Sequence, residues 1–144
     1  MSHAMVLAVH IAAGGCGLVF GVPAMRAAVM GSQRNRSTVA YQAAVTVLTV
    51  TALALAAMSW NRLWAFAAIA VATEVAVVGA WWTARRRLGM WRPWYVRLLC
   101  GSYVSLVTAL LVVSWGSLSA WVLPTVVGTV LVERAASHTP LVAN

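Results

Sequence analysis

The stretch LWAFAAIAVATEVAVVGAWWTARRR, residues Leu63–Arg87, carries the pattern that decides the fold. Its first twenty residues are apolar or small apart from Thr73 and Glu74, they close on two tryptophans, and three arginines follow shortly after. A helix needs about 20 mostly apolar residues to cross the hydrocarbon core of a bilayer. Tryptophan and then arginine are typical of the point where a helix leaves the membrane. The stretch therefore predicts a transmembrane helix over Leu63–Trp82.

Four more apolar runs flank this one. They are Ala4–Met25, Thr38–Met58, Trp94–Val113 and Leu118–Val132. The last run is shorter and contains Pro124 and Gly128, which transmembrane helices tolerate when neighbouring groups satisfy the freed backbone polar atoms. We therefore predict one all-α domain over residues 1–144. It is an integral membrane bundle of five transmembrane helices, or of four if the last run does not span.

The composition places the chain in a membrane rather than in water. Hydrophobic residues make up 62% of the 144 residues, and charged residues only 8%. A soluble domain has about 25% charged residues, so this chain has too few charges to cover its own surface in water. The net charge of +8 comes from arginines in the gaps between apolar runs. Because no soluble domain is predicted to present them as a patch, we expect the lipid bilayer, and not nucleic acid, as a partner.

The distribution of arginine predicts an orientation. Five crossings would place Arg62 alone on one side of the membrane and the other nine arginines on the opposite side. Cytoplasmic loops are enriched in arginine, so we expect a multi-pass protein of the cell membrane with its N-terminus outside and its C-terminus in the cytoplasm. All eight tryptophans lie near the ends of the runs, as in an interfacial aromatic belt. The N-terminus lacks the basic start of a signal peptide, so the first run is expected to remain as a helix.

Small residues recur at every fourth position in two of the runs. The first run has Gly17 and Gly21, and the last run has Gly128. This spacing lets helix backbones approach closely, so it predicts a helix-packing face. The face could lie inside the bundle or between molecules. The second alternative would make the protein a homo-oligomer or the partner of another membrane protein.

Glu74 is an acidic residue inside an apolar run. It lies about 16 Å from the predicted outer end of its helix, near the middle of a hydrocarbon core about 30 Å thick. An ionised carboxyl costs roughly 2.5–3.5 kcal/mol there on insertion scales, so such residues are usually functional. Thr49 and Ser105 are predicted at a similar depth. We therefore predict an intramembrane functional site of Glu74, Thr49 and Ser105. The alternative is a protonated Glu74 that points into the bundle and ties helices together.

Four arginines are candidate contacts for lipid head groups. Arg85, Arg86 and Arg87 are contiguous, and clusters of this kind at the cytoplasmic face of a membrane bind anionic lipids. Arg97 lies near the start of the fourth run, from which a long side chain can reach the interface. Glu133 follows the last run beside cytoplasmic arginines, so a surface ion pair accounts for it.

His10 is the histidine inside an apolar run and therefore the candidate for binding a cofactor. Haem iron or a metal would need a second ligand, but His3 and His138 lie outside the runs and on opposite predicted sides. The alternative is a hydrogen bond from His10 to a neighbouring helix. Ser102 and Ser105 lack the nearby histidine and acid of a catalytic triad. We therefore predict no catalytic residue, no metal site and no cofactor, with haem as the alternative.

Several segments together resemble a known family. They are VHIAAGGCGLVFGVPAM (Val9–Met25), RSTVAYQAAVTVLTVTALAL (Arg36–Leu55), GSYVSLVTALLVV (Gly101–Val113) and LPTVVGT (Leu123–Thr129). The chain resembles the small bacterial membrane proteins grouped as domain of unknown function 2306. That resemblance implies a polytopic helical protein of the bacterial plasma membrane with no assigned activity. Family members often carry three histidines, of which only the first is matched here, by His10.

Three functions remain open from the sequence. The first is a non-catalytic membrane component that packs against copies of itself or a partner protein through its small-residue faces. The second is a small proton-coupled carrier that uses Glu74. The third is a haem- or quinone-linked redox protein, which the histidines of the family suggest and their absence here weakens. We rank the three in this order and lean against an enzyme.

Overall fold

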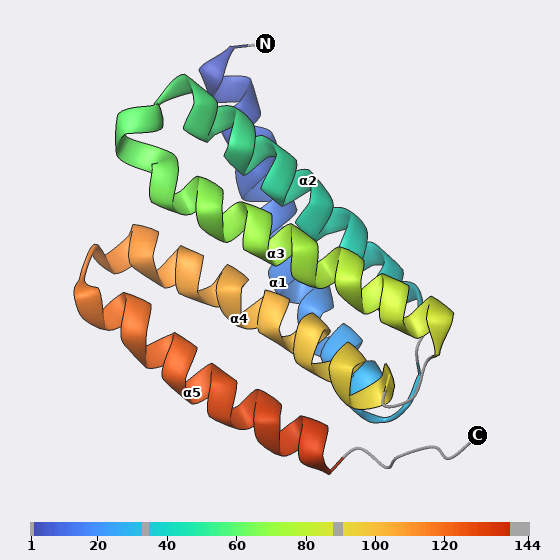
Figure 1. Ribbon diagram of the computed structural model, residues 1–144. Coiled ribbons are helices and arrows are strands. Elements are labelled where there is room, and N and C mark those ends of the chain that lie inside the picture. The colour runs from blue at the N-terminus through green and yellow to red at the C-terminus, as the bar shows by residue number, and fades with distance from the viewer. Residues whose placement is uncertain (1, 33–34, 88–90, 139–144) are drawn as a thin grey trace.

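The chain forms five helices and, in the part that the structure describes, no strand (Figure 1). The computed structural model describes residues 2–32, 35–87 and 91–138, apart from the side chains of Arg62 and Leu118. The helices are α1 (His3–Val29), α2 (Arg36–Met58), α3 (Trp60–Arg86), α4 (Trp91–Trp115) and α5 (Leu118–Ser137). Each contains one of the predicted apolar runs, so the all-helical prediction is confirmed.

Most of the helices extend beyond the predicted runs because backbone capping, and not hydropathy, ends a helix. After α1, Gly31 adopts a left-handed conformation with φ of 87°. The Gly31 and Ser32 amides then donate to the carbonyls of Ala28 and Ala27, at 3.1 and 2.8 Å. This is the arrangement of a Schellman motif, which satisfies carbonyls that the last turn leaves free. Helix α1 therefore continues past Met25, where the apolar run ends at an arginine.

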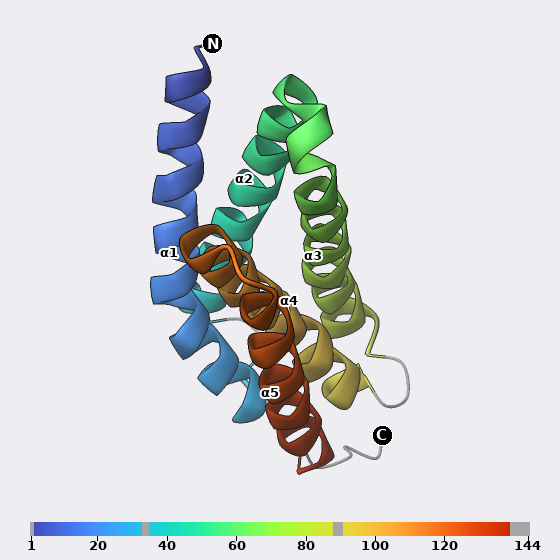
Figure 2. The same cartoon turned by 90° about the vertical axis from the view of Figure 1, so that its left-hand side faces the viewer.

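Helix α4 is the centre of the bundle. It contacts α1, α3 and α5, while α2 contacts α1 and α3 (Figures 1 and 2). The close contacts of α1, α2, α3 and α4 join them into a ring, and α5 packs chiefly on the outside of α4. This arrangement leaves α1 and α5 on either side of α4.

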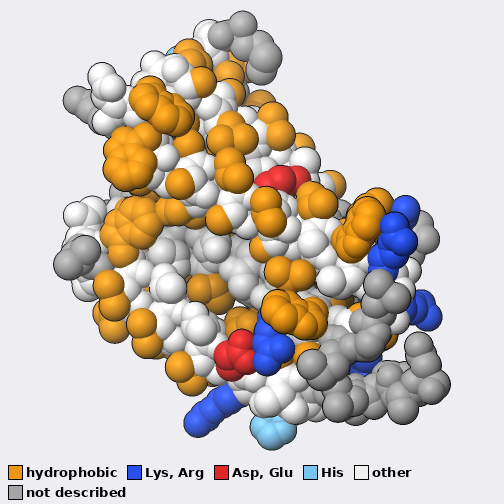
Figure 3. Space-filling model, viewed as in Figure 1, with side chains coloured by type: hydrophobic (Ala, Val, Ile, Leu, Met, Phe, Trp, Pro, Cys, Tyr) orange, Lys and Arg blue, Asp and Glu red, His pale blue; other side chains and the backbone are white. Residues whose placement is uncertain are grey.

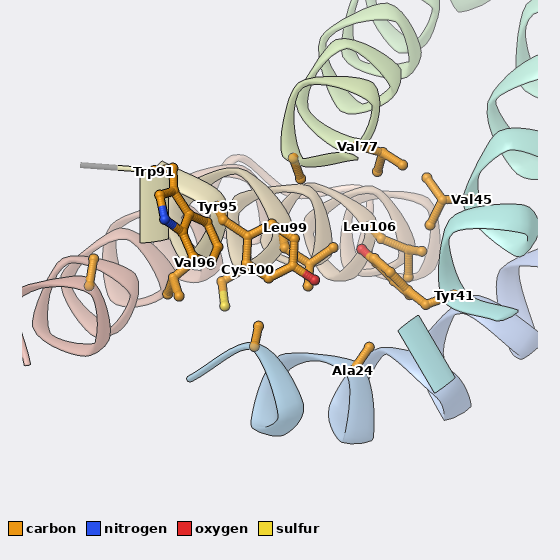
Figure 4. Close-up of a cluster of buried hydrophobic side chains, with 13 residues drawn as sticks. Ala24, Tyr41, Val45, Val77, Trp91, Tyr95, Val96, Leu99, Cys100 and Leu106 are labelled. Atoms are coloured by element: carbon orange, nitrogen blue, oxygen red, sulfur yellow. The ribbon is translucent and has the colours of Figure 1, made fainter. Parts of the chain in front are cut away.

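The buried core gathers around α4 (Figure 4). Tyr41 of α2 and Tyr95 and Leu99 of α4 are among its largest fully buried side chains. The Tyr41 hydroxyl lies 2.8 Å from Ser102 Oγ, and Ser102 Oγ also lies 2.7 Å from the Leu99 carbonyl oxygen. Bulky side chains therefore fill the centre of the four-helix ring, and one buried hydroxyl pair links α2 to α4 across it.

Among the described residues, four helical segments are long and apolar enough to cross a membrane. They are α1, α2, α4 and the part of α3 over Leu63–Arg86. Large apolar side chains on their outer surfaces are exposed, including Ile11, Val75 and Val113. The structure is thus that of a multi-pass membrane protein. Helix α5 has 20 residues, which is about 30 Å at the rise of an α-helix. This length matches the hydrocarbon core, and the crossing of the membrane by α5 stays a prediction.

The arginines described by the structure collect at one end of the bundle. This end, called the arginine end below, holds the last turns of α1, α3 and α5 and the first turns of α2 and α4. Its described arginines are Arg26, Arg36, Arg85, Arg86, Arg87, Arg92, Arg97 and Arg134. Figure 3 shows blue side chains along the right edge and the lower part of the molecule. Arg62 belongs to the first turn of α3 at the other end, and Arg34 lies outside the described residues.

Candidate functional site

The carboxyl group of Glu74 lies between two threonine hydroxyls of the neighbouring helix. Thr46 Oγ1 is 3.0 Å from Glu74 Oε1, and Thr49 Oγ1 is 2.7 Å from Glu74 Oε2. Thr49 is buried, Glu74 is half-buried and Thr46 is exposed. The site thus sits at the seam between α2 and α3, about halfway along both helices. This differs from the expectation that Glu74 points into the bundle.

The spacing of the two threonines explains why both reach one carboxyl. Residues three apart on a helix share a face, so Thr46 and Thr49 both point toward α3. Sequence reasoning found Thr49 from its depth and missed Thr46. The three-residue spacing within TVLT would have identified Thr46 as well. Thr73, beside Glu74, bonds to its own helix instead, with its hydroxyl 2.8 Å from the Ile69 carbonyl.

Counting protons distinguishes two states of this site. Thr49 Oγ1 lies not only against Glu74 but also 3.0 Å from the Thr46 carbonyl oxygen. The two threonine hydroxyls, with one proton each, cannot fill all three contacts as donors. A protonated Glu74 supplies the third proton by donating from Oε2 to Thr49, which then donates to the Thr46 carbonyl. Each of the three contacts has a hydrogen atom of its own only when the carboxyl is protonated; with an ionised carboxyl, Thr49 shares its one proton between two acceptors.

The surroundings of Glu74 contrast with those of Glu133. Glu133 forms a bidentate ion pair with Arg97 at the arginine end, with a shortest N–O distance of 2.8 Å. Among the described side chains, no cation forms an ion pair with Glu74. In Figure 3 one red patch adjoins blue side chains, and the other does not on this face. An ionised Glu74 would therefore lack the partner that a carboxylate needs in a medium of low polarity.

Ser105 does not reach the site. Its hydroxyl donates to the Gly101 carbonyl of its own helix at 3.2 Å. The prediction matched Ser105 to Glu74 by depth, which residue counting provides. The direction in which Ser105 faces depends instead on how α4 is rotated about its own axis, which packing sets. In the structure the Ser105 hydroxyl bonds within α4.

His10 contacts α2 through one ring nitrogen. Its Nδ1 lies 3.0 Å from Thr51 Oγ1 and 3.2 Å from the Leu48 carbonyl oxygen. The other two histidines, His3 and His138, are exposed at opposite ends of the bundle. Within the described residues no three histidine, cysteine or acidic side chains form a group that could hold a metal ion. The geometry of His10 is that of a polar contact between α1 and α2.

The four arginines proposed as lipid contacts each lie over a tryptophan ring. The guanidinium carbon is 3.9 Å from the ring centroid for Arg85 on Trp81 and 4.6 Å for Arg86 on Trp82. Arg87 pairs with Trp91 at 5.9 Å and Arg97 with Trp94 at 5.7 Å. These distances lie within the range of cation–π attraction. The arginine end therefore combines cations with aromatic rings, as a membrane interface requires.

The glycines of the predicted packing face contact side chains of the same chain. A Cβ atom on Gly17 would lie 2.9 Å from a methyl group of Leu106. One on Gly21 would overlap the ring of Tyr103. One on Gly128 would lie 2.6 Å from methyl groups of Val104. The small-residue spacing thus permits α1 and α5 to approach α4 within one molecule.

Comparison with protein-family models, with curated proteins and with solved structures finds no match. The membership of domain of unknown function 2306 therefore stays a prediction, which rests on the four sequence segments quoted above.

Proposed function

We propose that the protein is a small proton-coupled membrane carrier in which Glu74 takes up and releases the proton. The observation that carries this proposal is the contact of the Glu74 carboxyl with the hydroxyls of Thr46 and Thr49, halfway along α2 and α3. Ionisable residues at this depth are rare and mark ion pathways and proton relays in membrane proteins.

The chemistry of the site supports proton exchange over a purely structural role. Serine, threonine, asparagine or glutamine can tie helices together without introducing a group that ionises. A carboxylic acid adds the ability to change charge. With Glu74 protonated, every polar contact at the site is filled. With Glu74 ionised, the two threonine hydroxyls are both free to donate to the carboxylate.

The orientation of the carrier follows from the arginine end. We place this end in the cytoplasm because cytoplasmic segments are enriched in arginine. The N-terminus of α1 would then face outward, and the C-terminal end of α5 inward. The family resemblance supports the plasma membrane of a bacterium as the location.

The partner-binding function loses the observation that suggested it. A partner-binding component was inferred from small-residue faces, but Gly17, Gly21 and Gly128 are covered by side chains of the same chain. A redox role was suggested by the histidines of the resembling family, of which this chain matches only His10. Both remain predictions. The mass of the protein in detergent tests the first, and an absorption spectrum for haem or quinone tests the second.

Proton uptake into proteoliposomes under an imposed inside-negative potential tests the carrier. We expect the wild-type protein to carry protons through Glu74 even without its co-substrate and so to acidify the lumen, and Glu74→Gln to fall to the rate of protein-free vesicles. Glu133→Gln is the matched control because it removes the second acidic side chain of the chain from an interfacial ion pair. We expect it to retain uptake. Equal rates for wild type and Glu74→Gln, or no uptake by wild type, would contradict the proposal.

A further inference from the structure

An apolar groove of about 550 Å³ lies between α1, α4 and α5. Small-molecule sites in proteins have volumes of about 300–1,000 Å³, so the groove has the size of a ligand site. Met25, Tyr103, Val107, Val127 and Leu131 are among the side chains that line it. The residues of the Glu74 site do not belong to this lining, so the groove is a separate feature.

The groove exists because α1 and α5 pack on different sides of α4. Gly21 of α1 closes on Tyr103, and Gly128 of α5 closes on Val104. Among the described residues α1 and α5 have at most slight contact with each other. Figure 2 shows α1 at the left of α4 and α5 in front of α4. The lining comes from the end of α1, the middle of α4 and the part of α5 from Pro124 to Ala135, so the groove runs from the arginine end to about the middle of the bundle.

The charged residue in the groove lining is Arg26, in the last turn of α1. A second cation is close to the same helix end, because the guanidinium of Arg92 packs against Gly31. The groove is therefore apolar along its length and has cationic side chains at the end that lies next to the membrane interface. This end is called the mouth of the groove below. We propose that the groove binds an anionic phospholipid, with an acyl chain along the groove and the phosphate at Arg26.

The walls of the groove suit an acyl chain better than a helix. Closely packed transmembrane helices prefer small residues that allow their backbones to approach. Here the walls carry the longer side chains of Met25, Met30, Val107 and Leu131. Methionine is flexible and fills irregular apolar spaces, which matches a flexible hydrocarbon chain. Arg26 adds the charge that complements a phosphate, since cations at the interface attract anionic lipid head groups.

Native mass spectrometry of the detergent-purified protein tests the proposal, with phosphatidylglycerol and phosphatidylcholine of identical acyl chains as probes. Val127→Trp fills the groove. Its matched control is Val126→Trp, because Val126 is equally exposed on α5, at 56% against 54%, and lies outside the lining. Arg26→Gln removes the charge at the mouth. Its control is Arg36→Gln, an exposed arginine at the same end that does not line the groove.

We expect wild type and both controls to retain one phosphatidylglycerol in preference to phosphatidylcholine. Val127→Trp should lose the bound lipid, and Arg26→Gln should bind both lipids equally. Circular dichroism of each variant checks that the helices are intact. If Val127→Trp unfolds, the comparison of Arg26→Gln with Arg36→Gln tests lipid binding on its own. Unchanged retention by Val127→Trp would overturn the proposal, as would an unchanged preference in Arg26→Gln. A dimer that Val127→Trp abolishes would assign the groove to a second copy instead.

Discussion

At the scale of single residues, Glu74 shows how one acid is accommodated within a hydrophobic span. Its two carboxyl oxygens are both engaged by α2, at 3.0 Å from Thr46 and 2.7 Å from Thr49. In a bilayer such polar contacts link helices because water is not there to compete. Glu74 therefore contributes to the α2–α3 interface whatever its role in proton exchange.

Substitutions at Glu74 should separate these two contributions. Glutamine keeps one acceptor for Thr46 and adds an N–H that donates to Thr49, so Glu74→Gln should leave stability close to wild type. Glu74→Ala removes both contacts and should lower the free energy of unfolding by about 1–2 kcal/mol. Unfolding of the purified protein in mixed detergent micelles measures the difference. A glutamine variant as unstable as the alanine variant would indicate that the negative charge itself holds the helices together.

At the scale of helices, close approach to α4 depends on glycine. Gly21 of α1 faces the rings of Tyr103 and Tyr41, with no room for a methyl group. A methyl group at Gly15, on the same helix, would have no atom of a neighbouring helix within 4 Å. The two glycines therefore have opposite roles in one helix. The first permits packing, and the second only reduces helix propensity.

Alanine at these two positions should move stability in opposite directions. Gly21→Ala forces the tyrosine rings to shift and should destabilise the protein by about 1–3 kcal/mol, as overpacked cores do. Gly15→Ala should be neutral or stabilise by up to about 1 kcal/mol, because alanine is the better helix former. Unfolding in detergent compares them directly. Equal effects of the two substitutions would show that α1 does not pack on α4 through Gly21.

The sequence predicted the helices far better than their contacts. Hydropathy depends on composition along the chain, so it located all five helices, and residue counting placed Thr49 at the depth of Glu74. Which face of a helix meets which neighbour depends on the three-dimensional packing. For that reason Ser105 was assigned to the site although its hydroxyl bonds to α4, and Thr46 was overlooked.

At the scale of the whole molecule, the charge asymmetry divides the bundle into two ends. Eight described arginines lie at the arginine end, with tryptophan rings under four of them. This arrangement suits an interface where aromatic rings and cations meet lipid head groups. It also provides two exposed positions at opposite ends, Ser32 and Asn61, for testing orientation.

Labelling of single cysteines in intact cells should reveal the orientation. The background carries alanine in place of Cys16 and Cys100, which are free thiols. A membrane-impermeant maleimide should label Asn61→Cys and leave Ser32→Cys unlabelled until the cells are opened, because the arginine end is expected in the cytoplasm. The reverse pattern would invert the topology.

The attachment of α5 to one side of α4 has a consequence for biosynthesis. Contacts between α1 and α4 close the ring of the first four helices, and all four are synthesised before α5 leaves the ribosome. The surface of α4 that α5 covers is therefore synthesised before α5. Val104 precedes its contact Gly128 in the chain, and Arg97 precedes its ion-pair partner Glu133. Until α5 arrives, the lipid-facing side of α4 carries an arginine without its acid. The order of translation thus exposes this side of α4 before the helix that covers it has been made.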